Sequence, residues 1–265
     1  MYMTKTIALT TLVILGMSAD AFGQTSGVTS TSSASYRPII APNSVASGWG
    51  SNLSAITVAA NNTPIGGQPI TLPTTLGNVT LSVKDSLNNI TTPLLYLVSP
   101  GQITYVLPQA TALGLATLTV TSGTNTITGP VLVSNVSPAL YTVDGTGTGA
   151  PAGTALRVTT SNVVTNDPLN IGIFPNAIVL GASPSDRVYL VLYGTGIRNR
   201  SLNSVTATIG GVSVPVQYAG LQSTYPGLDQ VNVGPLVQGL VGKGTVSLIL
   251  TVDGVPANPV LVAFQ

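Results

Sequence analysis

The chain has 265 residues, of which 44% are hydrophobic and only 6% are charged, with a formal net charge of +1. It contains no His and no Cys, and its seven acidic residues are all Asp. These counts exclude a Ser-His-Asp triad, a thiol nucleophile and a zinc site of His or Cys ligands. They also argue against nucleic-acid binding, because no run of Lys or Arg is present to neutralise phosphates.

The first 23 residues are predicted to be a signal peptide. A short start carrying Lys5 precedes the apolar run "IALTTLVILGM" (Ile7–Met17), which is too short to span a bilayer. Small residues at Ala21 and Gly23 occupy the two positions that a signal peptidase reads, so we expect cleavage before Gln24. The prediction is a secreted protein, periplasmic or extracellular, with no membrane insertion after cleavage. The alternative is a buried N-terminal helix.

Residues 24–35 ("QTSGVTSTSSAS") have little to bury and are predicted to form a disordered Ser/Thr-rich linker. From Tyr36 onwards, short apolar runs are bounded by Gly and Pro. "VTLSV" (Val79–Val83) and "ATLTV" (Ala116–Val120) alternate with period two, which indicates antiparallel strands with one buried face. "VYLVLY" (Val188–Tyr193) is apolar throughout, which indicates a central strand covered on both faces. The chain is therefore predicted to be all-β.

Several phrases occur twice in the same order, which indicates a duplicated domain of about 90 residues. The matched phrases are "PGQITYVLP" from Pro100 with "PGLDQVNVGP" from Pro226, "GLATLTV" (Gly114–Val120) with "GKGTVSL" (Gly242–Leu248), "GPVLV" (Gly129–Val133) with "NPVLV" (Asn258–Val262), "LGNVTLSV" (Leu76–Val83) with "IGGVSVPV" (Ile209–Val216) and, more loosely, "WGSNLS" from Trp49 with "YGTGIR" from Tyr193. Gln102 and Gln230 occupy matching places, and we expect them either to bind backbone groups at a corner or to be solvated.

The predicted fold is two tandem immunoglobulin-like β-sandwiches, residues 36–135 and residues 180–265. Residues 136–179 are predicted to be a connector that contains a β-hairpin and packs against one or both sandwiches. Within it, "DGTGTG" (Asp144–Gly149) is expected to be a flexible hairpin tip.

The motifs that suggest chemistry are weak. "GLVGKGT" (Gly239–Thr245) is similar to a phosphate-binding loop, but Gly244 stands where Ser or Thr should follow Lys243. "DGTGTG" supplies one carboxylate, whereas calcium needs several. A carboxylate pair of a glycosidase could still be drawn from three residues, Asp167, Asp186 and Asp229. We predict no catalytic, cofactor-binding or metal-binding residue and no cofactor.

Four aromatic residues, Trp49, Tyr105, Tyr193 and Tyr218, are candidates for a platform that stacks against sugars, although aromatic residues of a sandwich more often pack in the core or between domains. "RNR" (Arg198–Arg200) is expected to be a solvated loop, with contact to an acidic partner as the alternative.

The predicted function is a non-enzymatic structural or interaction module that acts through its sandwich surfaces. Its partner would be a protein or a polysaccharide of the cell envelope or extracellular space, and unpaired strand edges would also allow self-association. A carbohydrate-binding adhesin module and a hydrolase with a carboxylate-only site are the alternatives.

Six phrases from Ala41 onwards are specific in combination: "PNSVASGWGSNL", "SPGQITYVLP", "VSPALYTVDGTGTG", "VYLVLYGTGIRNRS", "VTATIGGVSVPVQYAG" and "YPGLDQVNVGPL". Through them, nearly everything from Ala41 onwards resembles the uncharacterised C-terminal domain of secreted proteins from soil Acidobacteria of the Solibacter type. Trp49 departs from it, because a smaller aromatic residue is expected there. Each half is loosely similar to IPT/TIG immunoglobulin-like domains. The resemblance implies an extracellular β-sandwich module with no assigned activity.

Overall fold

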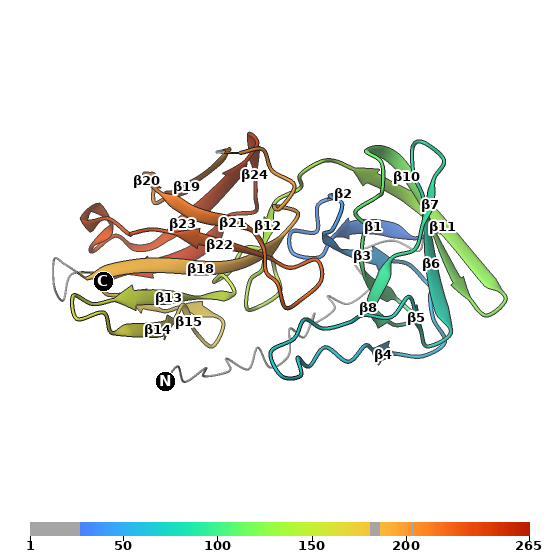
Figure 1. Ribbon diagram of the computed structural model, residues 1–265, viewed down its shortest axis with the longest axis horizontal. Coiled ribbons are helices and arrows are strands. Elements are labelled where there is room, and N and C mark those ends of the chain that lie inside the picture. The colour runs from blue at the N-terminus through green and yellow to red at the C-terminus, as the bar shows by residue number, and fades with distance from the viewer. Residues whose placement is uncertain (1–26, 181–185, 203) are drawn as a thin grey trace.

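The computed structural model describes residues 27–180, 186–202 and 204–265 (Figure 1). Within these ranges the chain is built of strands, with a short 3₁₀ helix at Gln238–Leu240 and no α-helix, which confirms the predicted all-β class. No helix in the described part is long and apolar enough to cross a membrane. The predicted signal peptide, residues 1–23, lies outside the described residues.

The first sandwich consists of two sheets that share one buried core. Sheet A has the order β1 (Thr29–Ser32), β3 (Val45–Trp49), β9 (Gln102–Val106), β8 (Leu94–Val98), β4 (Val58–Ala59). Sheet B has the order β2 (Ile39–Ile40), β11 (Asn125–Val133), β10 (Gly114–Ser122), β6 (Val79–Lys84), β5 (Thr75–Leu76), with β7 (Ile90–Thr91) beside β6. The predicted alternation holds on β6, where Val79, Leu81 and Val83 are buried and Thr80 is exposed.

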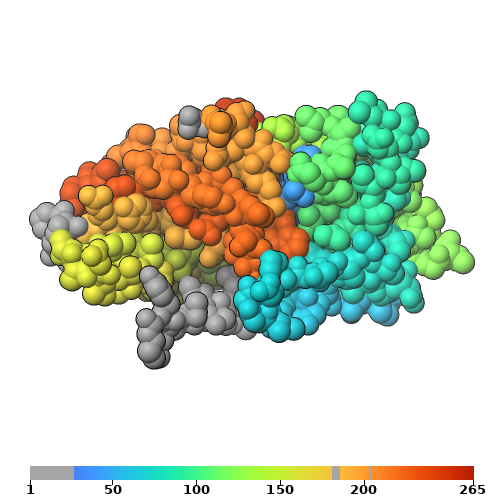
Figure 2. All heavy atoms as spheres, in the orientation of Figure 1, coloured from blue at the N-terminus to red at the C-terminus, as the bar shows by residue number. Residues whose placement is uncertain are grey.

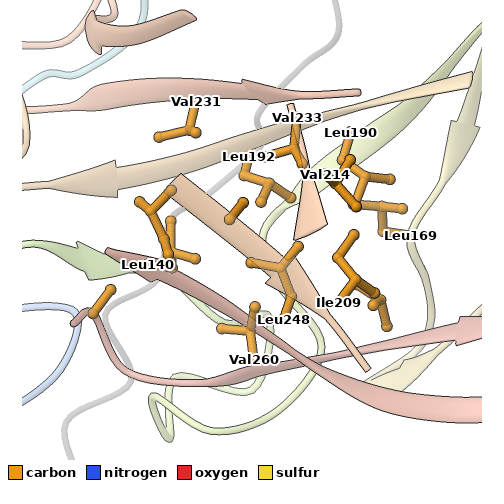
Figure 3. Packing of buried hydrophobic residues seen from close by; sticks show 14 of the residues in the cluster. Leu140, Leu169, Leu190, Leu192, Ile209, Val214, Val231, Val233, Leu248 and Val260 are labelled. Atoms are coloured by element: carbon orange, nitrogen blue, oxygen red, sulfur yellow. The ribbon is translucent and has the colours of Figure 1, made fainter. Parts of the chain in front are cut away.

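The second sandwich is built in the same way. Sheet C has the order β14 (Val164–Pro168), β13 (Gly153–Val158), β18 (Arg187–Thr195), β22 (Asp229–Val233), β21 (Val216–Leu221), with β12 (Ala139–Leu140) beside β18. Sheet D has the order β17 (Ala177–Ile178), β25 (Val260–Phe264), β23 (Gly244–Val252), β19 (Val205–Ile209), β20 (Val212–Val214), with β24 (Val255–Pro256) beside β23. Figure 3 shows side chains of the two sheets meeting in the core, among them Leu190 and Val231 of sheet C and Leu248 and Val260 of sheet D.

The two sandwiches repeat the same topology. The series β3–β9–β8 in sheet A corresponds to β18–β22–β21 in sheet C, and β2–β11–β10–β6 in sheet B corresponds to β17–β25–β23–β19 in sheet D. The strand pairs β2–β11 and β17–β25 are both parallel. One predicted match, residues 76–83 with residues 209–216, does not hold in the structure. Residues 76–83 include part of β6, which lies inside its sheet, whereas residues 209–216 include β20, which lies at an edge.

The predicted connector, residues 136–179, differs from what the structure shows. Four of its strands, β12, β13, β14 and β17, belong to the sheets of the second sandwich, and β15 (Asn170–Ile171) pairs with β16 (Phe174–Pro175). Strand β13 pairs with β18 along its whole length and places Ala155 in the core. The reason is that β18 needs a hydrogen-bonding partner on each side, and β13 supplies one of them.

The predicted disordered linker also differs, because its residues 29–32 form strand β1. Ser30, Thr31 and Ser32 are buried. The Tyr105 hydroxyl donates to Ser30 Oγ at 3.0 Å, and Trp49 Nε1 donates to Thr31 Oγ1 at 3.0 Å. The composition of residues 24–35 does not predict this strand, because the hydrogen-bond partners of Ser30 and Thr31, which are Tyr105 and Trp49, lie outside the segment.

The two sandwiches meet along a junction in which the cyan part of the first lies against the orange part of the second (Figure 2). Ile70 N donates to Thr224 O at 2.9 Å, and the Tyr96 hydroxyl donates to Pro226 O at 2.7 Å. Tyr225 packs on apolar clusters of both halves. The sandwiches are therefore joined by buried apolar and polar contacts.

Candidate binding surface

The four aromatic residues that the sequence singled out do not form one platform. Trp49 and Tyr105 are buried, with 6% and 0% of their surface exposed. Tyr193 is partly buried and Tyr218 is 40% exposed, and both belong to sheet C. A further tyrosine of this sheet, Tyr189, was missed, although its place in an alternating run could have shown that it shares a face with Tyr193.

Strand β18 is central, and its two faces are buried to different degrees. Val188, Leu190 and Leu192 are buried in the core, whereas Tyr189, Val191 and Tyr193 point to the other side and are partly exposed. The prediction that this strand is covered on both faces therefore holds for its inner face and only in part for its outer face. We call this side of the sheet the outer face of sheet C.

The strand register places three tyrosines and two amides together on this face. Tyr193 pairs with Gln230, and Asn232 lies between Val191 on one side and Tyr218 on the other. Tyr189 and Tyr193 are four residues apart on one strand, about 13 Å at the usual rise, and Tyr218 is two strands away from β18, about 10 Å. The five side chains thus surround one patch larger than a single sugar ring.

Glycines let two of the rings pack closely on the sheet. The Tyr218 hydroxyl donates to Leu221 O at 2.7 Å, and a Cβ added at Gly220 would lie 3.2 Å from that hydroxyl. The ring therefore runs along its own strand, with one face toward Gly220. A Cβ at Gly234 would lie 2.8 Å from Cδ1 of Tyr189, so the second ring also depends on the lack of a side chain beneath it.

Gln230 and Asn232 form an amide pair between the rings. Gln230 Nε2 donates to Asn232 Oδ1 at 2.9 Å, which fixes the orientation of both side chains. A primary amide has two donor hydrogens and an acceptor oxygen, so the pair keeps donors and an acceptor for a ligand. The matching Gln102 instead donates to Ser47 and Thr104 and is buried. Both glutamines bind side chains, not the backbone groups that the sequence suggested.

The equivalent face of the first sandwich is covered. Val45 and Val106 of sheet A pack with Ile70 and Leu72 from the segment after β4, and with Tyr225 from the second sandwich. Trp49, which corresponds to Tyr193, is covered in part by Tyr36, whose ring centroid lies 6.3 Å away. The duplicated face is thus buried in the first sandwich and partly exposed in the second, where Tyr193 packs on the cluster of Ala34, Tyr141 and Leu228 at the junction and Tyr218 is 40% exposed.

Charge on the outer face of sheet C is confined to its end. Arg187 is the first residue of β18 and points to the same side as Tyr189, far from the junction. The outward positions of β13, β18, β21 and β22 hold no carboxylate. A ligand bound at the centre of this face would therefore contact aromatic and amide groups, and only a ligand that reaches the end of β18 would contact the charged Arg187.

Asp229 begins β22 but is buried behind the face, with 0% of its surface exposed. Its carboxylate accepts hydrogen bonds from Arg198 Nε at 2.6 Å and from Ile197 N at 2.7 Å. Burial raises the pKa of Asp229, and the Arg198 guanidinium opposes that rise. Arg200 Nε donates to Ala219 O at 2.7 Å. The "RNR" segment is thus tied to the second sandwich and is not the solvated loop that the sequence suggested.

Neither Asp167 nor Asp186 forms a catalytic pair with Asp229. Asp167 lies on β14 and Asp229 on β22, three strand spacings apart, which is about 14 Å across the sheet alone. Asp186 precedes β18, and the partner of Asp229 on that strand is Gly194, about 26 Å further along. Glycosidase carboxylates lie about 5–9.5 Å apart. Within the described ranges, no group of three or more acidic, His or Cys residues could hold a metal ion.

The loop Asp144–Gly149 is held in place, in contrast to the predicted flexible tip. The Tyr36 hydroxyl donates to Gly145 O at 2.6 Å, and Leu261 N donates to Gly149 O at 2.9 Å. Asn258 Nδ2 donates to Gly147 O at 2.7 Å. The loop is thus part of the junction. Gly244 begins a strand, which agrees with the rejection of a phosphate-binding loop.

No family model matches the chain, and no curated protein matches it. Among solved structures, one similar chain is SGBP-B of the Bacteroides ovatus mixed-linkage glucan utilization locus, in complex with a mixed-linkage heptasaccharide. The match has 16% sequence identity and a TM-score of 0.35, and it covers 86% of this chain and 43% of that chain. The chain thus spans less than half of that protein, and a likeness of this size carries no argument about the ligand.

Proposed function

We propose that the chain is a non-enzymatic binding module that holds polysaccharide on the outer face of sheet C. The observation that supports this is the gathering of Tyr189, Tyr193 and Tyr218 around the Gln230–Asn232 amide pair. The same face is buried in the first sandwich, so its partial exposure distinguishes the second sandwich from the first.

The chemistry of the face suits a sugar polymer. A tyrosine ring has an electron-rich face, which attracts the weakly polarised C–H groups on the flat side of a sugar ring. Amide groups provide a donor and an acceptor side by side, which suits neighbouring sugar hydroxyls. An extended polymer could contact the two ends of the patch at the same time, whereas a monosaccharide could contact only one.

The charge distribution favours an uncharged polymer. Arg187 is exposed at the end of the face, and exposed charges contribute little binding free energy. The remaining groups are neutral, so no buried charge on the face requires a charged ligand.

The test is retention of the protein in native gels that contain soluble polysaccharides, neutral and acidic in separate lanes. We expect retention by at least one neutral polymer, and loss of that retention when Tyr189 and Tyr218 are both replaced by Ala. Thr119→Ala on the outer side of sheet B serves as the matched control, because Thr119 also points outward from a central strand. Migration unchanged by every polymer, or equal retention of both variants, would contradict the proposal.

A further inference from the structure

Strand β1 is short, polar and close to the start of the described chain. It ends sheet A and pairs only with β3, with Thr31 opposite Ser47. Two of its three buried side chains are held through their hydroxyl groups, since Ser30 accepts from Tyr105 and Thr31 accepts from Trp49, whereas Ser32 Oγ is buried without a hydrogen-bond partner among the described residues. Because the buried side chains of β1 are polar, exposing them to water costs little hydrophobic free energy, and the apolar cost of detaching residues 28–32 comes mainly from Val28.

The slot that β1 occupies is lined by both sheets of the first sandwich. Val28, just before β1, is buried in the core, and its N–H donates to Thr128 O on β11 at 3.3 Å. A Cβ added at Gly129 would lie 1.7 Å from Val28 O, so the sequence leaves room for the incoming backbone at this position. Residues 28–32 thus fill the slot in the register that places Thr31 opposite Ser47.

The turn that follows β1 is tight and strained. Tyr36 N donates to Ser32 O at 3.0 Å, and Ser32 N donates to Arg37 O at 2.8 Å. Tyr36 has a φ of 59°, a left-handed conformation that is costly for a residue with a side chain. Short hinges under strain favour the exchange of the element that they hold, because opening the hinge releases the strain. Opening this hinge also disturbs the hydrogen bonds of Tyr36 with Gly145 O and of Ser33 with Tyr141, so we expect the exchange to be slow.

We propose that β1 is exchanged between two copies of this chain, so that β1 of each copy fills the slot of the other. The reciprocal exchange closes a two-fold dimer and rebuilds the contacts of Ser30, Thr31 and Val28 with the partner. The dimer presents two outer faces of sheet C on one particle. That arrangement raises the avidity for any repetitive ligand without a new contact to it.

The test uses the lack of Cys in the chain, because single-Cys variants then report one contact each. Thr31→Cys and Ser47→Cys are purified separately, mixed at high concentration, incubated and oxidised. The expected product is a disulfide between the two different variants, identified by mass spectrometry. It requires β1 of one copy to lie beside β3 of the other.

The matched control mixes Ser47→Cys with Thr104→Cys. Thr104 faces Ser47 from the opposite side, on the central strand β9, which cannot leave without unfolding the sheet. We expect this mixture to give no mixed disulfide. Equal yields in the two mixtures would overturn the proposal.

A second measurement needs no substitution. Unlabelled and ¹⁵N-labelled copies of the chain are mixed at high concentration and followed by native mass spectrometry. Mixed dimers should accumulate slowly with a yield that rises with protein concentration. Monomers alone at every concentration would overturn the proposal.

Discussion

Tyr193 on β18 is the register partner of Gln230 on the adjacent strand β22 in sheet C. Trp49 on β3 and Gln102 on β9 are paired in the same way in sheet A. Both glutamines donate their side-chain amide to the residue two positions further along the strand, Asn232 and Thr104 respectively. The duplication thus kept the register and the amide contact. What changed is the cover, which is present over Trp49 and largely absent over the outer face of sheet C.

The first prediction concerns the tyrosine rings. Tyr218→Ala and Tyr189→Ala should each weaken polysaccharide binding by about 0.5–1.5 kcal/mol, the usual contribution of an aromatic contact beyond area burial. That corresponds to about a 2- to 13-fold rise in Kd for each variant. Isothermal titration with the polymer found in the gel assay measures the change. Equal affinity in Tyr218→Ala and Thr119→Ala would show that the face is not the site.

The second prediction concerns the glycine beneath one ring. Gly220→Val should push the Tyr218 ring off the strand, since even a Cβ would lie 3.2 Å from its hydroxyl. Binding should fall, while thermal stability changes little because the displaced ring can move into solvent. Titration and differential scanning calorimetry of the same sample separate the two effects. A variant that binds normally would show that the ring orientation does not matter.

The third prediction concerns the junction. Thr195 is buried, and its Oγ1 accepts a hydrogen bond from Val45 N and donates one to Gly227 O, both at 2.8 Å. Thr195→Val would leave these two groups without their partner, at a cost of about 1–3 kcal/mol for each. Calorimetry should show one unfolding transition in the unmodified chain and two in the variant. Thr195→Ser keeps the hydroxyl and should keep the single transition.

The fourth prediction concerns acid stability. The N–H groups of Ala112, Asn89 and Leu87 donate to the carboxylate of Asp85, with Ala112 the largest contributor, and hold its pKa below the usual value. A lowered folded-state pKa stabilises the fold above the unfolded value of 3.8, and this stabilisation is lost as pH falls through the folded pKa.

Asp85→Ala should therefore lower the unfolding midpoint in denaturant at pH 7, and the difference from the unmodified chain should shrink toward pH 2. Urea titrations at several pH values measure it. A difference that stays constant with pH would show that the carboxylate charge contributes nothing.

The fifth prediction concerns the slot for β1. Gly129→Val should prevent residues 28–32 from docking, because the added side chain would collide with Val28 O. Overpacking of this kind typically costs about 1–3 kcal/mol. Hydrogen exchange followed by mass spectrometry should show faster exchange at β1 than in the unmodified chain, with β10 unchanged. Protected β1 amides in the variant would contradict the steric argument.

Part of the fold could be predicted because it depends on local patterns. The alternation on β6 and β10 indicates which side chains are buried, since successive residues of a strand point to opposite faces. The Asp253-Gly254 pair has φ values of 50° and 79° and joins β23 to β24, as its residue types suggest for a tight hairpin. The pairing of Gln102 and Gln230 with equivalent aromatic residues follows from the repeat.

The linker and the connector were assigned incorrectly for one shared reason. Residues 29–32 and residues 139–178 are rich in polar residues or interrupted by Gly and Pro, and alone they have little to bury. Each becomes ordered because a distant segment supplies its partner: Trp49 and Tyr105 for β1, and β18 for β13. Contacts of this kind leave no periodic signal in the segment itself.

By itself the sequence determined the strand content, the duplication and the lack of His and Cys chemistry, because these depend on composition and short-range periodicity. The tertiary structure alone decided which of the duplicated faces is covered and which is open. That choice depends on where the segment after β4 docks on Val45 and Val106 and where the loop carrying Tyr225 docks. The loop docks through contacts between residues more than one hundred positions apart, such as Tyr96 with Pro226, which local patterns cannot encode.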